Sequence, residues 1–230
     1  YRLINDYAKK YNLFVLEDAA QSFGAQINKQ MTGSFGNVAG TSFFPAKPLG
    51  CYGDGGAIFC NDTEGLDEVL KSIRVHGSGI DKYDNIRTGL NGRLDTFQAA
   101  ILLEKLEIFG DELIRRNIVA NFYLENLPNN LTPQYIPNNY TSSWAQFSIM
   151  AESSETRNKI IKKINDNNLP SNIYYRIPLH LQKVFQFLGY QKGDFPISEK
   201  VSERIFSIPM HPYLKNEEQN QLLEILHDCI

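Results

Sequence analysis

The sequence predicts an α/β protein, in which a sheet domain over residues 1–112 precedes a smaller α+β domain over 113–230. Two observations support this organisation. In the first half, short apolar runs of strand length alternate with segments that carry apolar residues at helical spacing. From residue 128 onward, prolines punctuate an Asn-rich stretch, and shorter strand and helix patterns follow it.

Helix and strand patterns follow one another closely in the first half. We predict a helix over 1–11, strands over 13–17, 38–44 and 56–60, and a helix over 63–74. The first strand has the continuous apolar pattern of a buried parallel strand. The first helix has no N-cap ahead of it, so we expect the chain to be part of a longer protein. Thr63 is the expected N-cap of the second helix.

A polar, glycine-containing loop over 75–92 separates the two halves. The segment 93–127 then predicts one very long helix, or two helices that join near Gly110. In the last hundred residues we predict strands over 144–150, 173–177 and 205–208, and helices over 156–167 and 216–229.

Composition limits the classes of function. The 42% hydrophobic and 21% charged residues are ordinary for a globular protein, and no apolar run is long enough to span a membrane. The 23 basic and 26 acidic residues are not clustered, so we expect no nucleic-acid partner. Three cysteines without a CxxC pair, and four histidines without metal-ligand spacing, predict no disulfide framework, no metal site and a cytoplasmic location.

Two places in the first half carry side chains that could bind a ligand or take part in catalysis. Asp18 and Gln21 follow the carboxyl end of the first predicted strand, where α/β sheets bind their ligands. Asp18 is equally explained as a turn or cap residue. Lys47 lies between Pro45 and Pro48, where partial burial would favour a neutral, nucleophilic amine, although a lone lysine is more often a solvated surface charge.

Eight motifs follow one another along the chain: DAAQ at 18–21, GSFG at 33–36, TSFFPAKPLG at 41–50, GDGGA at 53–57, RVHG at 74–77, GLNGRLDT at 89–96, QAA at 98–100 and PLH at 178–180. Their combination resembles the DegT/DnrJ/EryC1/StrS family of nucleotide-sugar aminotransferases. The resemblance covers most of the chain, strongly over 16–127 and weakly beyond. It implies the fold type I of pyridoxal-phosphate-dependent aminotransferases, a three-layer sheet domain that is incomplete here, with a smaller α+β domain.

The resemblance gives five residues a role around pyridoxal phosphate. Lys47 matches the lysine that binds the cofactor covalently and then moves the proton of the substrate carbon. Asp18 matches the carboxylate that keeps the pyridine nitrogen protonated. Gln21 matches the amide at the ring hydroxyl, Ala20 the residue against the ring face, and Ser42 a phosphate ligand.

Further residues match positions that reach the site from elsewhere. Asn91 matches an asparagine that contacts the cofactor phosphate of the neighbouring subunit, which implies a homodimer with shared sites. A plain Asn-Gly turn is the alternative. Arg93 is either an anion clamp or part of the cap region of the long helix. Weaker substrate candidates, for which ordinary packing is the alternative, complete the set: His76, Arg93, Tyr174, Tyr175 and His180.

The implied activity is transfer of an amino group from L-glutamate to a keto sugar linked to UDP or dTDP, for cell-surface polysaccharide such as lipopolysaccharide. Lys47 favours amination, because a dehydrating branch of the family has histidine at that place. The alternatives are a catalytically silent, truncated homologue with an interaction or regulatory role, and a nucleotide-binding module without covalent chemistry. Family members are longer at the N-terminus, so we expect this chain alone to bind the cofactor weakly or not at all.

Overall fold

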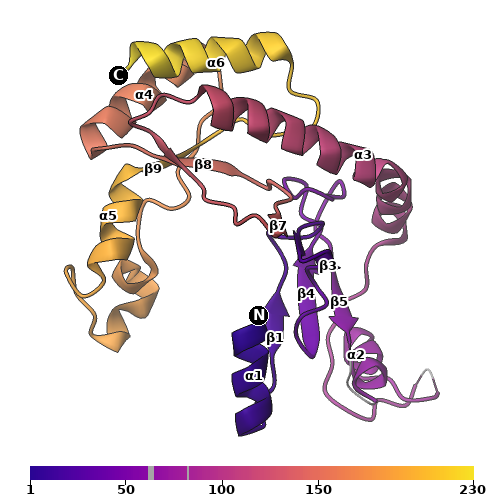
Figure 1. Ribbon diagram of the computed structural model, residues 1–230. Helices are drawn as coiled ribbons and strands as arrows, with labels where there is room; N and C mark the ends of the chain where they lie inside the picture. The colour runs from indigo at the N-terminus through magenta and orange to yellow at the C-terminus, as the bar shows by residue number, and fades with distance from the viewer. Residues whose placement is uncertain (62–64, 82) are drawn as a thin grey trace. The chain divides into compact units, whose positions relative to one another are not determined.

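The computed structural model describes residues 1–61, 65–81 and 83–230 (Figure 1). The chain divides into two compact units. Unit 1 consists of Tyr1–Leu113 and Pro137–Ala145, and unit 2 of Ile114–Ile136 and Gln146–Ile230. Both combine helices with sheets, which confirms the predicted α/β class. The assignment of 1–112 and 113–230 to separate domains stays a prediction.

The main sheet of unit 1 has the strand order β1-β4-β5. Strand β1 (Leu16–Asp18) runs parallel to β4 (Val38–Ser42), and β4 pairs antiparallel with β5 (Gly56–Cys60). All three strands were predicted, but β1 begins three residues later than expected. The register places Asp18 opposite Gly40 on the neighbouring strand.

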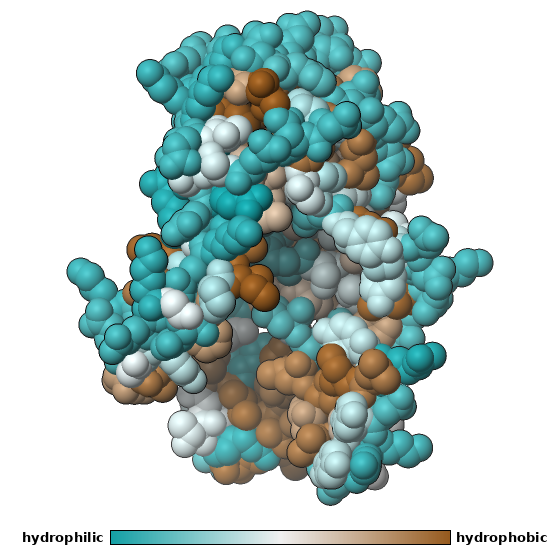
Figure 2. Space-filling view, turned by 60° about the vertical axis from the view of Figure 1, so that its left-hand side comes forward, coloured by the Kyte–Doolittle hydropathy of each residue, from teal (hydrophilic) through white to brown (hydrophobic). Residues whose placement is uncertain are grey.

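The expected burial of the first strand is wrong. The exposed fractions of Leu13, Phe14 and Leu16 are 60%, 59% and 71%. Leu13 and Phe14 precede β1, and β1 is an edge strand that pairs, among the described residues, with β4 alone. Figure 2 shows hydrophobic side chains gathered at the surface in the lower part of the view.

Two of the helices of unit 1 lie where the apolar periodicity predicts them. Helix α1 (Arg2–Tyr11) has no side-chain N-cap, as expected, and α2 spans Leu66–Arg74. The predicted cap, Thr63, lies outside the described residues. Three two-residue strands, too short to leave a pattern in the sequence, form a second sheet in the order β3-β2-β7: β2 (Gln26–Ile27), β3 (Gln30–Met31) and β7 (Tyr140–Thr141).

Helix α3 (Thr96–Asn126) is continuous over 31 residues, so Gly110 does not divide it. Its first part, to Leu113, belongs to unit 1 and its remainder to unit 2. In unit 1, Leu102 and Phe109 of this helix pack in a core cluster with Phe43, Leu49 and Cys51. Despite its length, α3 is not apolar enough to cross a membrane, and neither is any other helix in the described part of the chain.

Unit 2 is built on an antiparallel sheet in the order β6-β8-β9. The strands are β6 (Thr132–Pro133), β8 (Phe147–Met150) and β9 (Ile205–Ile208), and the helices are α4 (Ser154–Asp166), α5 (Pro196–Arg204) and α6 (Asn216–Asp228). Two short 3₁₀ segments, η1 (Leu179–Leu181) and η2 (Lys183–Leu188), precede α5. The side chains of Phe147, Ile160, Phe206 and Leu226 are completely buried in this unit.

One predicted strand of unit 2 is wrong. Residues 173–177 form no strand. Asn172, which precedes them, forms an isolated antiparallel bridge to Ser207. The run carries apolar and aromatic residues because several of them line a cavity, not because they pair in a sheet. Helix α5 was not predicted, since its sequence, PISEKVSER, is mostly polar.

Candidate active site

The parallel pairing of β1 and β4 brings Asp18 and Ser42 to one edge of the sheet. Because Asp18 is paired with Gly40 and side chains alternate along a strand, Asp18, Gly40 and Ser42 share one face. Asp18 is exposed, and its Oδ1 accepts a local hydrogen bond from the Ala20 N–H at 3.0 Å. Ser42 is half-buried, and its Oγ accepts the Phe44 N–H at 3.2 Å. Each side chain makes one local hydrogen bond, so the Asp18 carboxylate and the Ser42 hydroxyl can still form hydrogen bonds with a ligand.

Space for a flat group exists between these two side chains. A Cβ atom added at Gly40 would meet no other atom within 4 Å. The face of β4 beside Asp18 is thus open, with a carboxylate at one side and a hydroxyl at the other. This shape and this donor set fit an aromatic ring that carries a protonated nitrogen and a phosphate.

Lys47 comes from the turn that follows β4. The Lys47 N–H donates to Phe44 O at 2.9 Å, and the chain then returns to the core, where Leu49 and Cys51 are buried. The half-buried Lys47 side chain donates from Nζ to Oε1 of Gln21 over 2.8 Å. A neutral amide therefore orients the amine, and no carboxylate of the described residues forms an ion pair with it.

A tight turn after β1 sets the position of Gln21. The Ala19 N–H donates to Gly40 O at 2.8 Å, and the Ser22 N–H donates back to Ala19 O at 3.1 Å. Ala20 lies half-buried in this turn. The structure thus brings together the predicted residues of the first half: Gln21 and Lys47 by a direct bond, and Asp18, Ala20 and Ser42 by adjacency in the strands and the turn.

Sequence reasoning missed Glu17, which is only 2% exposed. It points to the face opposite Asp18, where Oε1 accepts the Gly33 N–H at 2.7 Å and Oε2 accepts the Phe35 and Gly36 N–H groups at 2.8 and 3.4 Å. These bonds fasten the turn that leads into β4. A carboxylate inside an apolar strand run was the signal that could have identified it.

Three further candidates lie in the loop after α2. Asn91 is bridged to Val75, the His76 N–H donates to Leu90 O at 3.0 Å, and Arg93 Nε donates to Asn91 Oδ1 at 3.2 Å. All three candidate side chains are exposed. Among the residues that the structure describes, no hydrogen bond or ion pair joins them to Lys47 or Gln21. Nor do any three His, Cys, Asp or Glu side chains there converge as metal ligands do.

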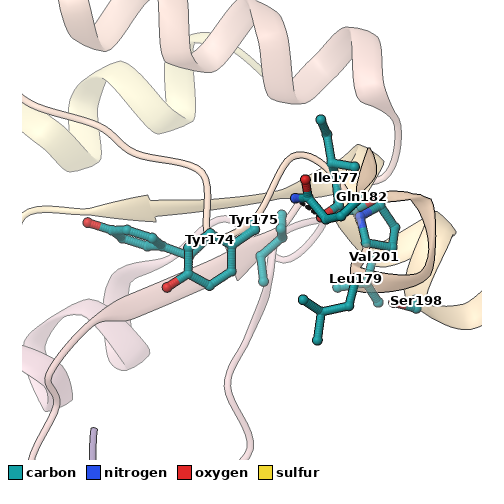
Figure 3. A pocket seen from close by; sticks show the side chains of 10 residues that line it. Tyr174, Tyr175, Ile177, Leu179, Gln182, Ser198 and Val201 are labelled. Atoms are coloured by element: carbon teal, nitrogen blue, oxygen red, sulfur yellow. Dashed lines mark hydrogen bonds between the residues drawn. The ribbon is translucent and has the colours of Figure 1, made fainter. Parts of the chain in front are cut away.

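Tyr174 and Tyr175 lie in unit 2, where both line a cavity of about 580 Å³ (Figure 3). Gln182 donates from Nε2 to Ile177 O across 3.4 Å and closes part of the wall. The remaining lining residues are Pro178, Leu179, Ser198, Val201, Ser202 and Ile205.

His180 does not line this cavity. Its side chain is only 8% exposed, and its Nε2 lies 3.0 Å from Oε1 of Glu199. The Glu199 carboxylate also accepts the Gly193 N–H, and this bond is the main reason why the pKa of Glu199 lies below its usual range. His180 is therefore held by a buried carboxylate.

The comparison with known proteins agrees with the motifs. The model of the DegT/DnrJ/EryC1/StrS aminotransferase family matches residues 2–227. A UDP-2-acetamido-2-deoxy-3-oxo-D-glucuronate aminotransferase from Pseudomonas aeruginosa is 42% identical over 92% of this chain and 57% of its own length. A dTDP-3-amino-3,6-dideoxy-alpha-D-galactopyranose transaminase from Aneurinibacillus thermoaerophilus is 39% identical over 97% of this chain and 60% of its own.

Solved structures show the same similarity. A DegT DnrJ EryC1 StrS aminotransferase from Brucella abortus superposes with a TM-score of 0.91 at 45% identity, over 99% of this chain and 60% of its own. NtdA from Bacillus subtilis, with bound cofactor PMP, superposes with a TM-score of 0.84 at 26% identity, over 98% of this chain and 52% of its own. The chain thus spans little more than half the length of the proteins it matches.

Proposed function

The chain belongs to the DegT/DnrJ/EryC1/StrS aminotransferase family, and from this premise we propose that it is a pyridoxal-phosphate-dependent sugar-nucleotide aminotransferase. The amino group moves from L-glutamate to a keto sugar linked to UDP or dTDP. The observation that carries the proposal is the 2.8 Å bond from Lys47 Nζ to Gln21 Oε1, beside the open face that carries Asp18 and Ser42.

Each residue of this site has a separate task in the proposal. Lys47 would hold the cofactor through its amine, and the same amine would serve as the base that moves the proton of the substrate carbon. Asp18 would keep the pyridine nitrogen protonated, and Ser42 would donate to the phosphate. Ala20 would pack against the ring, and Gln21 would bond the ring hydroxyl. The cofactor supplies the electron sink for the carbon that loses its proton.

We propose substrate contacts for residues that line a cavity or have exposed side chains. Tyr174 and Tyr175 offer two aromatic surfaces and two hydroxyl groups to a sugar in the cavity of unit 2. The exposed side chains of His76 and Arg93 are proposed to contact the substrate from the loop after α2. For His180 we propose an indirect role, because its side chain is bonded to Glu199 and hidden from the cavity.

A homodimer with shared sites is part of the proposal. The exposed Asn91, oriented by its bond with Arg93, would reach the cofactor phosphate of the partner subunit. A mixture of Lys47→Ala and Asn91→Ala chains tests this arrangement. Mixed dimers then contain one intact site, and the mixture should regain about a quarter of the original activity although each variant alone is inactive. No recovery, with dimers present, would contradict shared sites.

The proposed sugar and cellular setting draw support from the names of the relatives and from the composition. The two curated relatives are named for UDP-linked and dTDP-linked sugars. The FFPAKPLGCYGDGGA run favours a UDP-linked acetamido keto sugar, a 3-keto uronate included. A role in cell-surface polysaccharide and a cytoplasmic location complete the proposal.

Reductive trapping tests the proposal directly. Borohydride is added to the protein with pyridoxal phosphate, and the labelled peptide is mapped by mass spectrometry. We expect the label on Lys47, its loss in Lys47→Ala, and no change in Lys9→Ala, which removes an exposed lysine of α1. Because the chain is shorter than its relatives, we expect weak cofactor binding and a low yield of label. Label spread evenly over the lysines would end the aminotransferase proposal, whereas label on Lys47 without amino transfer would favour the silent homologue.

A further inference from the structure

A second cavity in unit 2, of about 520 Å³, lies between α4 and the segment before η1. Six of its lining residues come from two neighbouring rows of α4, in which the positions follow one another at intervals of four residues. One row is Arg157, Ile161 and Asn165, and the other is Asn158, Lys162 and Asp166; Ile173 and Arg176 complete the lining.

The lining is strongly cationic. Arg157, Lys162 and Arg176 contribute three positive charges, and Asp166 contributes one negative charge. Within the part of the chain that the structure describes, none of these four side chains forms an ion pair. The charged side chains of the lining therefore sum to an excess of two positive charges.

Two hydrogen bonds fix the Arg157 guanidinium and leave other N–H donors of the group available to a ligand. Its Nε donates to Asn158 Oδ1 at 2.8 Å, and its Nη1 donates to Ile205 O at 3.3 Å. No acceptor among the described residues is bonded to Nη2. Burial lowers the pKa of Arg157, and the positive charge of Arg176 lowers it further, with Glu203 opposing. Because both guanidinium groups line this cavity, an anion bound in it would offset the repulsion between them.

We propose that this cavity binds a doubly charged phosphate or diphosphate group. The planar forks of two arginines match phosphate oxygens, and Lys162 adds a third cation. The charge of a phosphate group, about −1.5 to −2 at neutral pH, balances the excess positive charge of the lining. The amides of Asn158 and Asn165 offer further donors at the rim. The lining shares no residue with the cavity of Tyr174 and Tyr175, and the proposal does not depend on the proposed function.

Calorimetric titration of the purified protein with inorganic pyrophosphate tests the proposal. We expect saturable binding that weakens as salt is added. Arg176→Gln and Lys162→Gln alter exposed side chains and should leave the fold intact, which the circular dichroism spectrum checks. Each should weaken binding by roughly tenfold or more, the effect of losing a hydrogen bond from a charged group. The matched control is Arg115→Gln, an exposed arginine of α3 in the same unit.

Two results would overturn the proposal: the absence of saturable binding at low salt, or equal affinities in Arg176→Gln and Arg115→Gln. A parallel titration with UDP separates the two sources of a diphosphate. Tighter binding of UDP than of pyrophosphate, weakened by Arg176→Gln, identifies the diphosphate of a nucleotide as the ligand. Equal or tighter binding of pyrophosphate, weakened in the same way, identifies a free phosphate compound.

Discussion

Nε2 of His180 lies 3.0 Å from Oε1 of Glu199, and the two side chains are only 8% and 10% exposed. The same carboxylate accepts the Gly193 N–H at 2.8 and 3.0 Å, and the His180 ring lies 4.8 Å from the ring of Phe195. One carboxylate of α5 thus fastens both η1 and the loop before α5. Since Leu179 of η1 lines the cavity of the two tyrosines, this pair holds one wall of that cavity.

Stability should depend on pH through Glu199. Its pKa is lowered chiefly by the Gly193 N–H bond and also by the bond with His180, while burial opposes. A lowered pKa in the folded state stabilises the protein above the ordinary glutamate value, about 4.3, and this contribution is lost as the pH falls through the folded value. Urea unfolding followed by circular dichroism should show less acid sensitivity in Glu199→Gln. Glu203→Gln, on the exposed side of α5, should behave as the unaltered protein does. Equal acid sensitivity in both variants would contradict this role.

Glu17→Gln should destabilise unit 1 by about 1–3 kcal/mol, because its amide group would face backbone N–H donors that the carboxylate now satisfies. The fluorescence of Trp144, which is buried in the same unit, reports the unfolding transition. Glu104→Gln, on the exposed surface of α3, is the control and should change little. Equal midpoints for the two variants would show that the Glu17 bonds add nothing to stability.

Two glycine substitutions should have opposite effects. A Cβ atom at Gly50 would lie 2.7 Å from the carbonyl oxygens of Phe44 and Pro45, so Gly50→Ala must displace the turn that carries Lys47. At Gly110, within α3, an added Cβ would meet no atom within 4 Å. Gly110→Ala should stabilise the protein by about 0.5–1 kcal/mol, because alanine favours the helix. Thermal melting compares the two, and a destabilised Gly110→Ala would argue against this helix geometry.

Asp18→Asn tests the proposed chemistry separately from cofactor attachment. The bond that Asp18 makes within the fold is local, so the variant should fold, and borohydride should still label Lys47. Amino transfer should fall by about a hundredfold or more, because a neutral amide would not keep the pyridine nitrogen protonated as a carboxylate does. Asp6→Asn, on the exposed surface of α1, is the control. Unchanged transfer rates in Asp18→Asn would remove this carboxylate from the proposal.

Local patterns in the sequence were sufficient to predict many of the helices and strands of this structure. Apolar periodicity located α1, α3 and α6, and strand-length runs located β4 and β5, because both patterns arise from the repeat of a single element. The motifs around Asp18, Ser42 and Lys47 were sufficient to indicate the family, which the match over residues 2–227 confirms. These features depend on residues that are neighbours along the chain.

The tertiary structure alone decided which side chains meet. The Lys47–Gln21 bond joins residues 26 positions apart, and the His180–Glu199 pair joins residues 19 apart, through segments that no periodic pattern describes. Helix α5 is mostly polar, and Glu199 fastens it to the preceding loop. Such contacts depend on strand register and on the path of turns. The periodicity of a sequence predicts which face of a helix or strand is apolar. It does not predict which residues that face contacts, because those contacts form when distant parts of the chain pack together.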